Sequence, residues 1–375
     1  MLLPAKALDL FLLLLAASKL RQRCNPTQGL DAAHPRYGAA AALLSGGLRH
    51  ARSKPPHDDD AAGVARAVTV DGEACVVTER CAASLGGLRR RWGLGRSLAA
   101  LGRSGPGAAL AAQVDGGSRG AARRGNVFLL SRDGRFVFKQ EDPSVLAALE
   151  GGLAEAYAQR AAARGSLLPR LVGAYTVERG GETTHWLATT NVFGCRPGGC
   201  VAVRDKYDVK GSTAGRRTRP RSGTLKDLDA LDDADALRVR GSERVLAALE
   251  ADTALLADLG LLDYSLLLGV METPARGPLR PLRRVLGAPL RAVRSLAFRR
   301  GAAGRGVAVL RGARRDGSFL VVGLIDILQP WTWAKKLEFL CRGALRGYGA
   351  ISAVPPATYR ARFLAFAGDL LGGAR

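Results

Sequence analysis

Alternating apolar and polar residues divide much of the chain into short segments that are typical of β-strands. Residues 68–77 form one such segment, and residues 126–130 and 135–139 form two more, joined by Asp133-Gly134. An Asp-Gly turn between two such runs is a good hairpin signal, so we predict an antiparallel hairpin there. The pattern predicts further strands over residues 171–177, 185–192, 201–210, 307–310 and 319–327.

Helical spacing appears in four other segments. They cover residues 88–101, which also carry a basic cluster, and residues 145–163, 242–259 and 358–371. Strands and helices occur in blocks and do not alternate one by one. We therefore predict an α+β fold and not a doubly wound sheet.

The first 65 residues differ in composition from the rest of the chain. Residues 8–17 form an apolar run about half as long as a membrane-spanning helix needs. No clear small-residue cleavage site follows, so we expect a protein that is not secreted. Residues 24–65 are rich in Ala, Gly, Pro and His, which is typical of a linker. We predict an apolar segment and disordered linker over 1–65, and one domain over 66–375 with a variable Arg-rich insertion over 274–306.

The charge of the chain points to an anionic partner. The 56 Lys and Arg residues exceed the 33 Asp and Glu residues, which gives a net charge of +23. Nucleic acid, an acidic membrane and a phosphorylated substrate all fit this charge, and part of it can reflect a general Arg-rich composition. Aromatic residues are few and lie mostly inside apolar runs, whereas base stacking needs them beside basic residues. We therefore expect no nucleic-acid partner.

The six cysteines are scattered along the chain. Cys195 and Cys200 are close in sequence, but no second cysteine pair or histidine follows nearby, so we predict no zinc site there. A chain of this length does not need disulfides to fold, and we expect a reducing compartment.

Three charged residues lie in or beside apolar runs. Asp263 and Asp326 are each flanked by aliphatic residues on both sides, and Lys139 ends the run over 136–138, after a Gly-rich turn. A buried carboxylate is costly unless it is paired, hydrogen-bonded or bound to metal, so the two aspartates are candidates for a catalytic or metal-binding pair. The alternatives are an aspartate bonded to backbone at a strand end, and a lysine that is solvated on an edge strand.

The segment from residue 206 to 213 has a second kind of pattern. Strand alternation places Lys206, Asp208 and Lys210 on one face. Gly211 and Ser212 then offer a turn with N–H groups and a hydroxyl, which predicts a phosphate site. The alternative is the solvated face of a hairpin.

These segments, in this order, resemble the phosphatidylinositol phosphate kinase family over about residues 80–373. The most specific likeness is NVF over 191–193 followed by KYDVKGST over 206–213 and by Arg216, similar to the family's KYDLKGSTxxR stretch. LDYSLL over 262–267 resembles MDYSLL, LIDIL over 324–328 resembles IIDIL, and Lys335-Lys336 resembles a dilysine further along. Among the members, the likeness is greatest to the type I phosphatidylinositol 4-phosphate 5-kinases.

The resemblance implies a two-lobed lipid-kinase fold that is distantly like protein kinases. An antiparallel N-terminal lobe would cover about 66–190, and a mixed α/β C-terminal lobe about 191–375. The cofactors implied are ATP and Mg²⁺. The partner implied is a phosphoinositide in an anionic membrane, and a homodimer is a further expectation. The location implied is cytoplasmic, peripheral at the inner face of the plasma membrane.

The resemblance also assigns roles to matching positions. Asp263 would orient the inositol hydroxyl, Lys210 would lie near the transferred phosphate, and Asp326 would hold Mg²⁺. The residues that would contact ATP are Lys139, Thr189, Asn191, Val192, Phe193, Gly117, Ser118 and Gly120. The last three belong to a glycine loop that is longer and more basic than the family's short form. The residues that would contact the lipid or the membrane are Lys206, Lys210, Arg216, Lys335, Lys336 and Glu338.

Residues 331–353 would be the activation loop, which in this family recognises the lipid headgroup. Trp331 and Trp333 would lie at the membrane interface. The family has Glu in this loop in the 4-phosphate 5-kinases and Ala in the 5-phosphate 4-kinases. Glu338 falls near that place, so we expect phosphatidylinositol 4-phosphate as substrate and the 4,5-bisphosphate as product.

Two other functions are alternatives to this one. A catalytically decayed protein that only binds phosphoinositides or nucleic acid would explain the charge, but it would not need to retain Lys139, Asp263 and Asp326 together. A protein kinase is the other alternative, and the chain lacks the HRDxxxxN and DFG patterns of that class.

Overall fold

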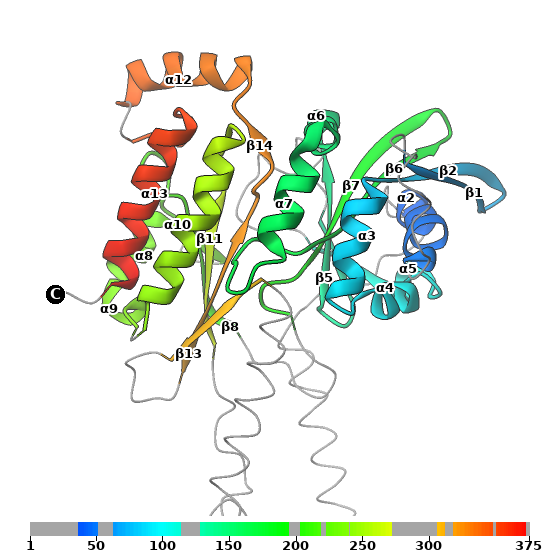
Figure 1. Cartoon of the computed structure of the whole chain (residues 1–375), viewed down its shortest axis with the longest axis horizontal. Helices are drawn as coiled ribbons and strands as arrows, with labels where there is room; N and C mark the ends of the chain where they lie inside the picture. Colours follow the sequence, from blue (N-terminus) through cyan, green and yellow to red (C-terminus); the bar gives the residue numbers. More distant parts are fainter. Residues whose placement is uncertain are drawn as a thin grey trace, which may run out of the picture.

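Two main β-sheets, each built from a separate part of the chain, form the frame of the molecule (Figure 1). The computed structural model describes residues 37–51, 63–113, 128–194, 203–218, 223–239, 241–271, 306–311, 318–347 and 350–372. Strands up to residue 190 form one sheet, and five of the strands from residue 203 onward form the other. This arrangement agrees with the predicted α+β class.

The first sheet has seven strands, and all of its neighbouring strands are antiparallel. In spatial order the strands are β1 (Val64–Val70), β2 (Glu73–Arg80), β6 (Leu171–Arg179), β7 (Glu182–Thr190), β5 (Phe136–Glu141), β4 (Phe128–Ser131) and β3 (Leu110–Gln113). The predicted hairpin is confirmed as β4 and β5. Because β5 lies between β7 and β4, Lys139 is on an interior strand, and the edge-strand alternative is wrong.

The second sheet has five strands and one parallel pair. In spatial order the strands are β12 (Ala308–Arg311), β13 (Phe319–Ile325), β11 (Ser265–Met271), β8 (Val203–Val209) and β9 (Thr224–Leu225), of which β8 and β9 are parallel. Ser265 at the start of β11 pairs with Ile325 at the end of β13, and Leu266 pairs with Val209 at the end of β8. The residues just before β11, just after β13 and just after β8 therefore meet at one end of this sheet. A short pair, β10 (Leu261–Leu262) with β14 (Gln329–Pro330), lies beside it.

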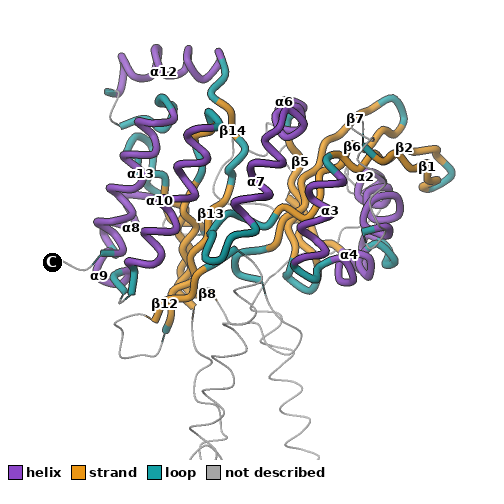
Figure 2. The backbone as a smooth tube through the Cα atoms, viewed as in Figure 1, coloured by secondary structure: helices purple, strands orange, loops and turns teal. Residues whose placement is uncertain are grey.

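Helices cover both faces of the first sheet, with α2 (Tyr37–Ala42) and α4 (Gly95–Leu101) on one side and α7 (Ala154–Ala161) on the other (Figure 2). The largest apolar cluster joins α3 (Ala82–Arg91), α7, α10 (Glu243–Asp258) and α13 (Pro356–Leu371) to the strands. Further short helices are α5 (Pro106–Ala109), α6 (Pro143–Ala148), α8 (Asp227–Asp232) and α9 (Ala234–Leu237). In the part of the chain that the structure describes, no helix has the length and apolar character needed to cross a membrane.

Most predicted helices are present, but two are interrupted at glycines. The segment 88–101 contains the end of α3 and all of α4, separated at Gly93, whose φ is +67°. The segment 145–163 contains α6 and α7, and the kink between them contains Gly152 with a φ of +97°. The helices predicted over 242–259 and 358–371 are confirmed as α10 and α13.

Three predictions of irregular structure or of a single strand are corrected. Residues 68–77 are not one strand, because Asp71 and Gly72 turn the chain between β1 and β2. Residues 37–51 are helical, and Leu43, Leu44 and Leu48 are buried against the first sheet, so the linker prediction is wrong for that stretch. Residues 333–346 of the expected activation loop form a helix, α12 (Trp333–Arg346).

Several other predictions concern residues outside those that the structure describes. They are the apolar run over 8–17, the linker between 52 and 62, the glycine loop with Gly117, Ser118 and Gly120, the pair Cys195 and Cys200, and nearly all of the insertion over 274–306.

A buried aspartate of α10 connects the helices that pack on the first sheet to the second sheet. Asp252 of α10 is fully buried; its Oδ1 accepts hydrogen bonds from Arg160 Nε of α7 at 2.6 Å and from Ser166 Oγ at 3.0 Å. Its Oδ2 accepts the Leu167 N–H at 2.6 Å. Leu167 also binds the second sheet, because its carbonyl accepts the Leu324 N–H of β13 at 3.0 Å. These contacts fix the end of the second sheet relative to the helices of the first.

Candidate active site

Asp263 and Asp326 lie close together because the strands beside them are neighbours. Asp263 is in the connection between β10 and β11, and Asp326 directly follows β13. Both have left-handed backbone conformations, with φ of +62° and +56°. Aspartate is one of the few non-glycine residues that adopt this conformation readily. The turn beside Asp263 is further held by the hydroxyl of Tyr359, which donates a short hydrogen bond to the Tyr264 carbonyl.

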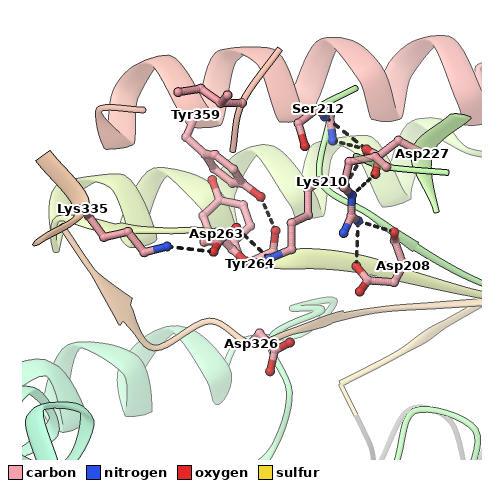
Figure 3. Close-up of polar contacts among 12 residues, drawn as sticks. Asp208, Lys210, Ser212, Asp227, Asp263, Tyr264, Asp326, Lys335 and Tyr359 are labelled. Carbon is pink, nitrogen blue, oxygen red and sulfur yellow. Dashed lines mark hydrogen bonds and ion pairs between the residues drawn. The ribbon is translucent and has the colours of Figure 1, made fainter. Parts of the chain in front are cut away.

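Lys210 reaches Asp263 from the adjacent strand. It directly follows β8, and its Nζ lies 2.6 Å from Asp263 Oδ1 and 2.6 Å from the Asp263 carbonyl oxygen (Figure 3). The side chains of Lys210 and Asp263 are 15% and 19% exposed, so the ion pair is mostly screened from solvent. The predicted association of these two residues with one site is therefore present in the geometry.

A second lysine approaches Asp263 from α12. Lys335 Nζ lies 3.4 Å from Asp263 Oδ2 and 3.1 Å from Glu338 Oε2. Burial alone would raise the pKa of Asp263, but the ammonium groups of Lys210 and Lys335 outweigh burial and hold that pKa below its ordinary value. The carboxylate therefore stays ionised at neutral pH.

Lys139 brings the first sheet into the same site. Its Nζ lies 2.8 Å from Asp326 Oδ1 and 2.9 Å from Glu141 Oε1. Burial acts to lower the pKa of Lys139, but the two carboxylates outweigh it and raise that pKa, so the ammonium is retained. For Asp326, burial is in turn outweighed by Lys139 and Lys210, which lower its pKa. Glu141 was not predicted as a site residue, although it lies two residues from Lys139 on the same face of β5.

The turn after Lys210 does not offer its N–H groups to an external phosphate. The N–H groups of Lys210, Gly211 and Ser212 donate to Asp227 Oδ1 at 2.8, 2.7 and 3.1 Å. The predicted phosphate site at these N–H groups is therefore wrong, because a carboxylate of the chain itself fills it. Asp227 was not predicted either.

Arg216 belongs to the same network. Its Nε lies 2.5 Å from Asp227 Oδ2. Its Nη2 lies 2.5 Å from the Asp208 carbonyl oxygen and 3.2 Å from Asp208 Oδ1. Burial acts to lower the pKa of Arg216, and the two carboxylates outweigh it and raise that pKa. The structure thus places Arg216 in an internal ion-pair network, and its contact with substrate stays a prediction.

The predicted adenine-site residues lie at the junction of the two sheets. Asn191 Nδ2 donates to the Gly134 carbonyl at 2.9 Å, and Asn191 Oδ1 accepts the Phe193 N–H at 3.1 Å. Val192 is buried in a small apolar cluster of the second sheet, and Phe193 packs against that cluster. Thr189 is half-buried near the end of β7. Contact of these residues with a nucleotide stays a prediction.

The remaining predicted residues lie on β8 and α12. Lys206 is half-buried on β8, opposite Gly269 of β11. Lys336 Nζ lies 4.7 Å from the centroid of the Trp333 ring, and Trp331 makes an edge-to-face contact with Phe339. Of the dilysine pair, therefore, Lys335 points to Asp263 and Lys336 packs on an exposed aromatic side chain.

The carboxylates of the site fit one kind of metal binding. Among the residues that the structure describes, no group of three or more His, Cys, Asp or Glu side chains is arranged to hold a metal ion. Magnesium is usually held by one or two carboxylates together with nucleotide phosphates and water. Asp326, ionised and 39% exposed, fits the role of such a ligand for a cation that arrives with a nucleotide.

Comparison with known proteins gives a family match. The family model described as phosphatidylinositol-4-phosphate 5-kinase matches residues 116–283 and 299–370, which is more than half of the chain. The matched ranges include Lys139, Lys210, Asp263, Asp326 and Lys335.

Individual relatives include both specificity classes. The rat phosphatidylinositol 4-phosphate 5-kinase type-1 alpha is 29% identical over 271 residues, which cover 64% of this chain and 48% of that protein. The rat phosphatidylinositol 5-phosphate 4-kinase type-2 beta is 33% identical over 169 residues, 43% of this chain and 39% of the relative. Its human counterpart is 29% identical over 297 residues, 69% of this chain and 70% of the relative. The chain thus spans about half or less of the first two relatives.

The family match and the geometry of the site agree. The motifs that carry the resemblance lie together at one end of the second sheet. There Asp263 contacts Lys210 and Lys335. Asp326 contacts Lys139 of the first sheet. The chain belongs to the phosphatidylinositol phosphate kinase family.

Proposed function

We propose that the protein transfers the γ-phosphate of ATP to a hydroxyl of the inositol ring of a phosphatidylinositol phosphate. The observation that carries this proposal is the convergence of Lys139, Lys210, Asp263 and Asp326, two oppositely charged pairs that come from distant parts of the chain. Phosphoryl transfer depends mainly on positioning and on charge stabilisation, and these four groups supply both.

Each group has a role that follows from its contacts. Asp263, kept ionised by two lysines, accepts the proton of the inositol hydroxyl as it attacks phosphorus. Lys210, in contact with Asp263, offsets the negative charge that develops on the transferred phosphoryl group. Lys139 binds the nucleotide phosphates, and Asp326 is the ligand for Mg²⁺, which when bound screens the charge on those phosphates.

The two sheets support this division of labour. We take the first sheet to be the smaller lobe of a two-lobed kinase and the second sheet to be the larger lobe, with a distant likeness to protein kinases. Lys139 comes from the first sheet, whereas Asp263, Asp326 and Lys210 come from the second, so a nucleotide bound between them would contact both.

The exposed face of α12 supports a membrane-bound substrate. Trp333, Leu337 and Leu340 are 83%, 62% and 57% exposed. Their spacing of four and three residues places them on one side of the helix, and Figure 1 shows α12 at one extremity of the molecule, beyond the end of α13. Such a face would enter the headgroup region of an anionic membrane, with Lys336 beside it. We propose a peripheral location at the cytoplasmic face of the plasma membrane.

Glu338 favours the 4-phosphate lipid as substrate and the 4,5-bisphosphate as product. Its Oε2 is 3.1 Å from Lys335 Nζ, and that ammonium is 3.4 Å from the Asp263 carboxylate. Glu338, which we assign to specificity, is thus linked through Lys335 to Asp263, the residue that orients the acceptor hydroxyl.

The test is an assay of phosphate transfer from radiolabelled ATP to liposomes that carry either the 4-phosphate or the 5-phosphate lipid. We expect turnover of the 4-phosphate lipid in the wild type and loss of turnover in Asp326→Asn, which removes the charge of the proposed Mg²⁺ ligand. Transfer to the 5-phosphate lipid alone would overturn the specificity. The chain would be a lipid-binding protein and not an enzyme if it bound liposomes but showed no phosphate transfer that the Asp326 variant abolishes.

A further inference from the structure

A single buried carboxylate holds the backbone that carries Lys210. Asp227, at the start of α8, is fully buried. Its Oδ1 accepts three consecutive N–H groups, from residues 210, 211 and 212, and its Oδ2 faces Arg216 Nε (Figure 3). A buried carboxylate without such partners would be strongly destabilising, and these four donors satisfy both oxygens of Asp227.

The same turn is confined on its other side. Gly211 has a φ of +70°, and a Cβ at this position would lie 3.1 Å from the backbone of Arg362 and Phe363 in α13. The Thr213 and Ala214 N–H groups donate to the Ala350 carbonyl at 3.1 and 2.9 Å. The turn is therefore fixed between α8, α13 and the segment before α13, and it has little freedom to move.

This fixed turn determines where the Lys210 ammonium lies. The Lys210 N–H donates to Asp227 at 2.8 Å, while its Nζ is 2.6 Å from Asp263 Oδ1, so the two ends of one residue are bound to two carboxylates. A lysine side chain is flexible, and its position at the far end depends on the position of its Cα. A shift of the Cα by about 1 Å is enough to cost a hundredfold in rate when it misplaces a reacting group.

We propose that Asp227 is a positioning residue for phosphoryl transfer, which acts by fixing the backbone of Lys210 so that the ammonium stays on Asp263. This inference rests on the proposed function, because it assigns a role within that site. Asp227 itself contacts neither nucleotide nor lipid in this scheme, because its oxygens are occupied by the turn and by Arg216.

The first test is a double-mutant cycle in kcat with Asp227→Asn and Lys210→Met. The amide is a neutral acceptor, and its bonds to the turn are about half as strong as those of the carboxylate. We expect Asp227→Asn to lower kcat by about tenfold or more, with the KM for ATP changed less than about twofold. With Met at position 210, the same change should lower kcat no further. An equal loss in both backgrounds would show that Asp227 only supports the fold.

The matched control is Asp232→Asn, the same change on the same helix, where the side chain is exposed and pairs with Arg217. It should leave kcat unchanged. If Asp227→Asn does not fold, as judged by thermal unfolding, Asp227→Glu replaces it. That variant keeps the charge but displaces the carboxylate by one methylene, so the same loss of kcat is expected.

A second readout does not depend on activity. In competitive labelling with acetic anhydride and mass spectrometry, we expect Lys210 to react several-fold faster in Asp227→Asn than in the wild type, because its ammonium leaves Asp263. Lys139, which is held by other carboxylates, should react at an unchanged rate. Unchanged labelling of Lys210, or an equal rise at both lysines, would overturn the inference. Absence of lipid phosphorylation by the wild type would instead overturn the proposed function, and the labelling would still decide the role of Asp227.

Discussion

Neighbouring lysines lower the pKa values of Asp263 and Asp326, the two acidic candidates for catalysis. Asp263 is bracketed by Lys210 and Lys335, one on each carboxylate oxygen. Because ammonium groups favour the charged form of a carboxylate, each lysine contributes to keeping the pKa of Asp263 low.

Replacing Lys335 should therefore change the pH dependence of the reaction. Loss of its positive charge in Lys335→Met raises the pKa of Asp263. The reaction needs the ionised carboxylate, so the acidic limb of the kcat/KM profile moves to higher pH. The control is Lys336→Met, whose ammonium lies over Trp333 and away from Asp263. An acidic limb at the wild-type pH in both variants would contradict this account of Asp263.

Glu141 has a separate effect on nucleotide binding. Lys139 is shared between the carboxylates of Asp326 and Glu141, and of these two Glu141 would remain its partner once Asp326 binds a cation. Glu141→Gln should raise the KM for ATP by about tenfold, the loss expected for one charged hydrogen bond, and leave the KM for lipid unchanged. The control is Asp142→Asn, a change at the next residue, because asparagine caps α6 as well as aspartate does. An equal rise in the KM for ATP in both variants would argue against a specific role for Glu141.

At the scale of single residues, the sequence predicted most charged groups of the site but not Asp227 or Glu141. Asp263, Asp326 and Lys139 stood out because charges inside apolar runs need an explanation. Asp227 gave no such signal, because its partners lie 11 to 17 residues away in the sequence. Glu141 is only two residues from Lys139 on β5, and that spacing could have indicated the contact.

The secondary-structure elements were predictable where the pattern was local. The hairpin of β4 and β5 and the helices α10 and α13 follow from turn residues and from apolar spacing. The helix α12 was expected to be a loop on the basis of the resemblance, although Trp333, Leu337 and Leu340 have helical spacing. The helical stretch over 37–51 was missed for a similar reason, since its Ala- and Gly-rich composition obscured the leucines that pack on the first sheet.

The apolar face of α12 gives a prediction at this scale. The variant Leu337→Ser with Leu340→Ser should bind anionic vesicles about thirtyfold more weakly, because the loss of each leucine side chain removes about 1 kcal/mol of transfer free energy. The thermal unfolding temperature should not change, since neither side chain is buried. The control is Leu231→Ser on α8, an exposed leucine on another helix. Vesicle binding unaffected by the double change would mean that α12 does not touch the membrane.

At the scale of the whole molecule, the site depends on strand register. Lys210, Asp263 and Asp326 meet because the ends of β8 and β13 lie beside the start of β11. The hydrophobic pattern indicates which face of a strand is buried, but it does not say which distant strands become neighbours. The grouping of these residues was therefore predicted from the family resemblance and not from periodicity.

The connection between the two sheets should be sensitive to Asp252. Asp252→Ala leaves the Leu167 N–H without its acceptor and removes the partner of Arg160. The free energy of unfolding should fall by about 3 kcal/mol, measured by urea denaturation. Asp258→Ala, at an exposed position at the end of the same helix, should have little effect. Equal stability of the two variants would show that the Asp252 contacts do not join the two parts of the molecule.

The left-handed backbone at Asp263 and Asp326 has a consequence for which residues these positions tolerate. Alanine in this conformation costs about 1 kcal/mol, whereas asparagine and glycine adopt it readily. An alanine knockout at either position therefore disturbs the turn as well as the chemistry. Asparagine keeps the shape and removes only the charge, so in a saturation library the folded but inactive proteins should be enriched in asparagine and glycine at both positions.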